Sequence, residues 1–135
     1  GAIRRHRPEV LISINHHASW GAGINHADHR AVGIALLDAS RDAANRWLFP
    51  GFGGEAWGGV RFALFGGSPL ATHWTDVSAT IDAGVASLRE HQTYLDALPE
   101  GTVGKDPEPF LRSLASAAGA GLGVEAATTF ELVEL

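Results

Sequence analysis

The sequence predicts an α/β layered fold with a mainly parallel sheet. Short apolar runs typical of buried strands alternate along the chain with segments in which apolar residues recur at three- or four-residue spacing. The chain has 135 residues, of which 45% are hydrophobic and 19% charged, so it can fill one core. No internal repeat or linker is visible. We therefore expect a single domain over residues 1–135.

The first half of the chain predicts two strands around a long helix. Val10–Ile14 is an almost unbroken aliphatic run typical of a strand buried on both faces, and it ends at Asn15. An amphipathic helix is expected from Asn25 to about Leu48. Its apolar stripe is Val32, Leu36, Ala39, Ala43 and Trp47. A glycine-rich loop then leads to a second strand over residues 60–65.

The second half predicts a short strand, two helices and a closing strand. Residues 74–78 are the short strand, and a helix is expected over 80–98, where Pro99 stops it. A further helix over 109–118 ends in glycines, and residues 128–135 form the last strand. The basic residues Arg4, Arg5 and Arg7 are expected to close a short helix before the first strand.

Composition excludes several classes of function. The net charge of −5 argues against a surface that neutralises nucleic-acid phosphates, and the absence of cysteine excludes disulfides and thiolate metal sites. No apolar run approaches the roughly 18 residues of a membrane span, and no signal peptide is evident, so the expected location is the cytoplasm. Because methionine is absent, we expect a fragment or a processed chain.

The segment richest in side chains that could bind a metal or catalyse a reaction is His26-Ala27-Asp28-His29, at the start of the long helix. One interpretation is a polar helix start, with Asn25 as the N-cap and Asp28 at the third helical position. The other is a functional site, because a helix N-terminus disfavours imidazolium and keeps both histidines neutral, the form that binds zinc. One metal needs three or four ligands, so these two histidines require further partners.

Other histidines and tryptophans have simpler explanations. His16 and His17 follow the first strand, but adjacent strand residues point to opposite faces, so at most one is expected to reach the site, and loop or packing roles are favoured. His91 lies on the apolar stripe of the second long helix, which favours a buried, hydrogen-bonded histidine. Trp20 and Trp57 lie in loops expected near the site, where packing is the simplest role.

The order of these motifs resembles the zinc-dependent de-N-acetylases of the PIG-L, or LmbE-like, family. That family carries a His-Pro-Asp-His motif where this chain has His26-Ala27-Asp28-His29, a Val-Asp-Val segment near Asp76, and a later His-x-Ser-Gln helix matched by residues 91–94. The resemblance spans essentially the whole chain but only the second half of the family domain. It implies a Rossmann-like three-layer fold of which residues 1–135 are the C-terminal portion.

The resemblance also implies roles for individual residues. His26 would polarise the substrate carbonyl or stabilise the oxyanion, Asp28 would orient the site as a supporting group, and His29 would bind zinc. His91 and Trp20 would contact the substrate, an N-acetylated amino-sugar conjugate of the N-acetylglucosamine type. The family's remaining ligands and its base lie in an Ala-His-Pro-Asp-Asp-Glu loop that this sequence lacks. The implied zinc hydrolase is therefore completed by a missing N-terminal segment or a companion chain.

The sequence leaves other hypotheses open. In the first hypothesis, the chain is one half of a split or proteolysed enzyme, and the other half is a companion chain of roughly 100 residues or more. Alternatively, it is a non-catalytic, metal-free binding or regulatory module of the same fold. A third hypothesis is a structural fragment with an exposed sheet edge, which would aggregate in isolation.

Overall fold

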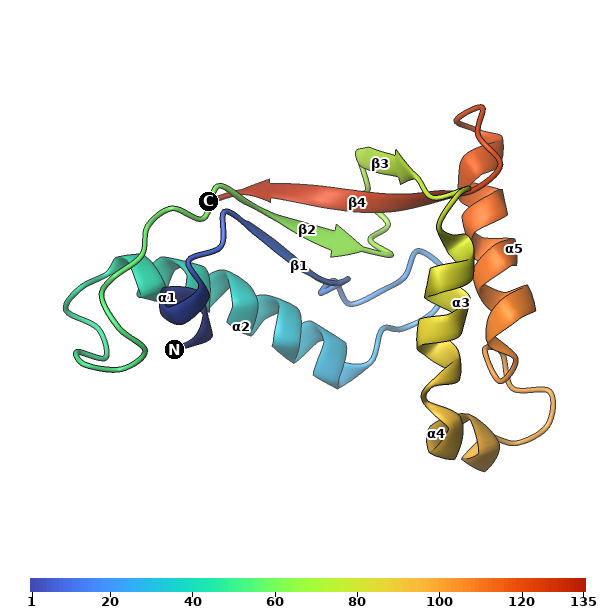
Figure 1. Ribbon diagram of the computed structural model, residues 1–135, viewed down its shortest axis with the longest axis horizontal. Coiled ribbons are helices and arrows are strands. Elements are labelled where there is room, and N and C mark those ends of the chain that lie inside the picture. The colour runs from blue at the N-terminus through green and yellow to red at the C-terminus, as the bar shows by residue number, and fades with distance from the viewer. The chain divides into compact units, whose positions relative to one another are not determined.

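The computed structural model describes all 135 residues and contains five helices and four strands (Figure 1). In chain order these are α1 (Ala2–His6), β1 (Val10–Ile14), α2 (Ala27–Ala44), β2 (Phe62–Gly66), β3 (His73–Asp76), α3 (Ile81–Arg89), α4 (Gln92–Ala97), α5 (Pro107–Ala120) and β4 (Ala127–Glu134). The alternation of strands and helices confirms an α/β fold. None of the helices combines the length and apolar composition needed to span a bilayer.

The four strands form one mixed sheet in the order β1-β2-β4-β3. β1 runs parallel to β2, with Val10 opposite Phe62, whereas β4 runs antiparallel to β2, with Glu131 opposite Phe65. The expectation of a mainly parallel sheet is therefore wrong. The expectation fails because β4 pairs directly with β2 and runs antiparallel to it. The apolar pattern of a single strand does not reveal the direction of its neighbour.

The chain divides into two compact units, Gly1–His73 with Thr129–Leu135, and Trp74–Thr128. The first contains α1, α2, β1, β2 and most of β4. Its buried strand is β2, where Ala63 and Phe65 have no exposed surface. β1 lies at the edge of the sheet, and Ile12 on this strand is 67% exposed.

The second unit is built on the packing of α3 against α5. Ion pairs reinforce this contact: Arg112 bridges Asp82 and Glu108, and Arg89 also pairs with Glu108. α5 begins with Pro107 after Asp106, whose side chain accepts a hydrogen bond from the Glu108 N–H.

The helix expected over residues 80–98 is two helices. α3 ends at Arg89, and α4 begins after His91, whose backbone leaves the helical conformation at φ −82° and ψ 38°. His91 is exposed, so its interpretation as a buried core histidine is also wrong. Because the helix is interrupted at His91, this residue does not lie on the apolar face that one continuous helix over residues 80–98 would have given it.

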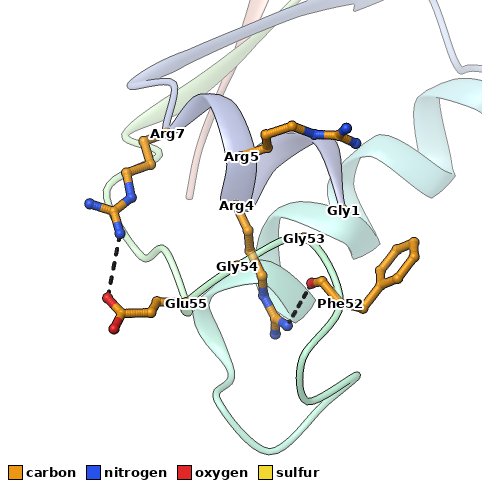
Figure 2. A pocket seen from close by; sticks show the side chains of 8 residues that line it. All are labelled: Gly1, Arg4, Arg5, Arg7, Phe52, Gly53, Gly54 and Glu55. Atoms are coloured by element: carbon orange, nitrogen blue, oxygen red, sulfur yellow. Dashed lines mark hydrogen bonds and ion pairs between the residues drawn. The ribbon is translucent and has the colours of Figure 1, made fainter.

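Arg4 connects α1 to the far end of α2 (Figure 2). Its side chain is only 5% exposed and donates hydrogen bonds to six backbone carbonyls. The acceptors are Asp42 O, Ala43 O, Asn45 O, Leu48 O, Phe49 O and Phe52 O, at 2.8 to 3.4 Å. Several of these carbonyls also accept a backbone N–H, such as Asp42 O from Asn45 and Ala43 O from Trp57. The buried guanidinium therefore adds further hydrogen bonds to them, and its charge complements the helix dipole. The short helix expected before β1 is present, but Arg4 closes α2 rather than α1.

We predict that Arg4→Met lowers the free energy of unfolding by at least about 3 kcal/mol, because hydrogen bonds to charged groups contribute about 1.5–3 kcal/mol each and their carbonyl partners would stay buried. Urea unfolding followed by circular dichroism measures this loss. The matched control is Arg5→Met, because Figure 2 shows the neighbouring Arg5 directed away from the loop, and its loss should stay within about 0.5 kcal/mol. Equal losses in the two variants would contradict the role given to Arg4.

Candidate active site and metal centre

The candidate site lies in the first unit, in the loop that joins the end of β1 to the start of α2. A single β-bridge between Ser19 and Ile24 closes this loop on itself, and Gly21 and Gly23 make the reversal with φ of 98° and 90°. Ser19 Oγ donates to Gly23 O at 2.8 Å and accepts from Gly21 N. The loop is therefore a defined structure that can position side chains.

Two buried asparagines fix the path of the loop. Asn25 is 2% exposed, and its Nδ2 donates to Asn15 O at 2.7 Å and to His17 O at 3.0 Å. Asn15 has no exposed surface, donates from Nδ2 to Ser19 O, and accepts the His17 N–H on Oδ1. The hypothesis that Asn25 caps α2 is wrong, because the N-cap residue is His26 and the Asn25 side chain bonds across the loop instead.

This network orients His29. Because both donor hydrogens of the Asn25 amide face backbone carbonyls, its Oδ1 is the atom that faces His29 Nδ1, at 3.1 Å. An amide oxygen only accepts, so the proton of neutral His29 lies on Nδ1 and the lone pair on Nε2. A metal-binding histidine is commonly held in this way by a polar partner on its other nitrogen.

The other predicted residues lie around His29. The His26 ring is 5.4 Å from the His29 ring and makes no capping hydrogen bond, so it is free to bind another group. The Trp20 and His29 rings are nearly perpendicular, at 84°, with their centroids 5.7 Å apart. The Asp28 carboxylate is 79% exposed and 4.0 Å from His29 Nε2, beyond hydrogen-bonding distance.

A second cluster contains His16, His17 and Glu131. One ligand atom from each residue lies within 4.8 Å of the others, so this group could hold a metal ion. His17 Nε2 is 2.7 Å from Glu131 Oε2, which also accepts from Ser68 Oγ at 2.6 Å. The His16 and His17 rings are 4.5 Å apart. The expectation that they diverge is wrong, because β1 ends at Ile14 and strand alternation ends with it.

Electrostatics favours a neutral His16 beside an ionised Glu131. Burial, and then the neighbouring His17, lower the pKa of His16, while Glu131 partly opposes them. Burial alone would raise the pKa of Glu131, but hydrogen bonds from Ser68 and His17 keep it below its ordinary value. A neutral imidazole and a carboxylate are the forms in which these side chains bind metals.

Two other predicted residues belong to other segments of the chain. His91 belongs to the second unit, Trp74–Thr128, where it is the N-cap residue of α4. Trp57 donates from Nε1 to Pro8 O, before the start of β1, and so lies at the opposite end of this strand from the loop. The expectation that Trp57 lies near the site is wrong.

Comparison with solved structures identifies the fold. The chain matches N,N'-diacetylchitobiose deacetylase from Pyrococcus horikoshii, solved with its inhibitor MPG, with a TM-score of 0.73 and 17% identity over 98% of this chain and 48% of that one. It also matches the conserved protein TT1542 from Thermus thermophilus, with a TM-score of 0.70 and 24% identity over 96% of this chain and 53% of that one. This chain has the fold of part of an LmbE-like domain.

The likeness to an LmbE-like domain confirms the resemblance seen in the sequence at the level of the fold. The chain spans about half the length of these solved structures. No protein-family model and no curated protein matches the sequence. Activity and site residues therefore rest on the geometry of the chain itself.

The sequence did not reveal Glu131 or Ser68 as site residues. Glu131 sits between apolar residues of β4 and contacts His17, 114 positions away. Ser68 follows a Gly-Gly pair that indicates only a turn. A carboxylate between two apolar neighbours, Phe130 and Leu132, is the single available signal.

We predict that Asn25→Asp lowers the free energy of unfolding by about 3 kcal/mol or more, because a carboxylate oxygen would face the buried carbonyls of Asn15 and His17 in place of two donors. Urea unfolding at neutral pH measures it. Asn45→Asp is the control: Asn45 is exposed and its side chain makes one hydrogen bond, accepting the Trp47 N–H on Oδ1, which a carboxylate also accepts, so the change should stay within about 0.5 kcal/mol. Similar losses would show that the Asn25 amide orientation is misassigned.

We also predict opposite effects for two mid-helix glycines. A Cβ on Gly33 would lie 2.3 Å from His16 Cβ, whereas a Cβ on Gly84 would lie 4.0 Å from Leu111 Cδ1. Gly33→Ala should destabilise the protein by about 1–2 kcal/mol after overpacking offsets the helix gain, and Gly84→Ala should stabilise it by about 1 kcal/mol. Thermal unfolding of the two variants compares them, and a stabilising Gly33→Ala would disprove the close contact with His16.

Proposed function

We propose that this chain carries part of the active site of a zinc-dependent amide hydrolase that removes the acetyl group from an N-acetylated amino-sugar conjugate of the N-acetylglucosamine type. The observation that carries the proposal is the state of His29, whose Nδ1 is held by buried Asn25 and whose Nε2 keeps its lone pair. The fold shared with a deacetylase acting on N,N'-diacetylchitobiose supports this class of substrate.

The residues at the start of α2 would have separate roles in zinc binding and catalysis. His29 would hold zinc through Nε2, and zinc when bound supplies a Lewis acid and a water of lowered pKa. His26, free of capping hydrogen bonds, would donate an N–H to the oxygen that becomes negative during attack on the amide. Asp28, between the two histidines in the sequence, would orient the site as a supporting group.

Trp20 would contribute a substrate contact beside His29. The two ring centroids are 5.7 Å apart, and the aromatic face of Trp20 could support a sugar ring. A substrate contact by His91, exposed at the start of α4, stays a prediction that rests on the resemblance alone.

His29 needs ligands that this chain does not provide. The chain's only group of three histidine or carboxylate side chains within ligand distance is His16, His17 and Glu131, and it does not include His29. β1 exposes an edge with Ile12 uncovered, where further strands could pair. We propose that an N-terminal segment or a companion chain adds the missing ligands there.

The test uses the protein together with this additional segment, with N,N'-diacetylchitobiose as the first substrate. His29→Ala should lose one zinc per molecule and all acetate release. His26→Ala should keep zinc and lower kcat about 10²- to 10³-fold, the typical cost of losing one oxyanion donor. Exposed His73, bonded only to Thr72, provides the control variant His73→Ala, which should match the unmodified protein.

Two results would overturn the proposal. Full zinc content and turnover in both His26→Ala and His29→Ala would show that these residues are not the site. A complete protein that binds an amino sugar but holds no zinc and releases no acetate would instead support the non-catalytic, metal-free binding module.

A further inference from the structure

We propose that His16, His17 and Glu131 form a second metal site, separate from His29, that binds a divalent transition-metal ion, zinc foremost. The three ligand atoms already lie within 4.8 Å of one another. All three residues belong to the first unit of the chain, so the site is complete without any added segment. This inference does not rest on the proposed hydrolase activity.

The geometry is close to that of a bound state. Zinc lies about 2.0–2.2 Å from imidazole nitrogen and carboxylate oxygen, so tetrahedral ligand atoms stand roughly 3–4 Å apart. The pair His17 Nε2 and Glu131 Oε2, at 2.7 Å, has only to open slightly to admit the ion. The His16 ring lies beside His17 with a tilt of 31°, so the two rings share one side of the loop.

The donor set selects the class of ion. Two imidazoles and one carboxylate form the His₂Glu set used by several zinc enzymes, with a fourth position left for water. Mg²⁺ and Ca²⁺ prefer all-oxygen sites and are not matched by two nitrogen ligands. The side chains of His17 and Glu131 remain 31% and 16% exposed, which leaves an ion a path from solvent.

The surroundings hold the ligands in place. Ser68, 7% exposed, donates to Glu131 Oε2 and accepts the Leu70 N–H, which fixes the carboxylate. Asn15 and Asn25 fix the backbone that carries the two histidines. Hydrogen-bonded second partners of this kind orient ligands and raise metal affinity.

A metal ion explains His16 better than an ion pair does. A His17–Glu131 pair accounts for two of the three residues and leaves His16 without a role. His16 packs on Phe65 at 4.4 Å, and its Nδ1 is the one buried side-chain polar atom in the chain that has no hydrogen-bond partner. Since buried polar atoms are almost always paired, this ring lacks the polar partner that an ion would give it.

The experiment titrates the 135-residue chain carrying His29→Ala with Co²⁺, whose visible absorption reports coordination, and then displaces Co²⁺ with Zn²⁺. One ion per chain is expected, and millimolar Mg²⁺ should not compete. Glu131→Gln, which keeps the shape and the hydrogen-bond acceptor, and His17→Gln should each weaken binding at least about 100-fold, the upper end of the range for altering a metal's supporting shell. Ser68→Ala should weaken binding about tenfold, within the range seen for second partners. His73→Gln is the matched control and should bind as tightly as the parent.

The outcomes separate this site from the proposed hydrolase. Unchanged affinity in Glu131→Gln or His17→Gln, with circular dichroism showing folded protein, would overturn the second site and leave the cluster as an ion pair. Loss of Co²⁺ binding caused by His29→Ala alone would assign the ion to the hydrolase centre and also overturn it. One tight ion that survives His29→Ala and is lost in both cluster variants would establish the site, whatever the activity assays show.

Discussion

The arrangement of the candidate site depends on one buried amide, that of Asn25. Its two donor hydrogens hold the carbonyls of Asn15 and His17, at the end of β1, and its oxygen holds the ring of His29, in the first turn of α2. Because each of its polar atoms has a partner and almost no access to water, the amide has one favourable orientation. The protonated nitrogen of His29 follows from that orientation.

α2 is fixed over the sheet by three different kinds of contact. At its start the Asn25 network determines where the helix begins, and at its end Arg4 donates hydrogen bonds to the carbonyls of Asp42, Ala43 and Asn45. Between them, Gly33 lets His16 approach the helix more closely than any side chain would allow. Breaking the polar contacts at either end costs free energy, because a buried guanidinium or amide without its partners keeps its full desolvation penalty. The apolar contact in the middle sets the spacing between strand and helix.

Local patterns in the sequence predicted the elements but not their partners. The runs around Val10 and Phe62 and the stripe of α2 follow from short-range periodicity, and these elements were found within a few residues of their expected bounds. The direction of β4 and the break at His91 depend on contacts made elsewhere in the chain. Local sequence favours a helix cap at Asn25, a common use of asparagine, and favours Arg4 as the closing residue of its own short helix, where a cation suits the dipole. Both act on backbone groups that sequence spacing cannot identify.

The two histidine groups share the same support, which couples them. His17 O accepts a hydrogen bond from Asn25 Nδ2, and His29 Nδ1 faces Asn25 Oδ1. A displacement of either histidine would therefore shift the Asn25 amide and, through it, the other histidine. An ion bound by His17 and Glu131 would join the loop to β4, and an ion present at about 100 times its Kd favours the folded loop by about 2.7 kcal/mol. That energy would oppose any rearrangement that frees Asn25 from His17. Metal bound at the second site would thus keep His29 in the one tautomer suited to a ligand, without touching the substrate itself.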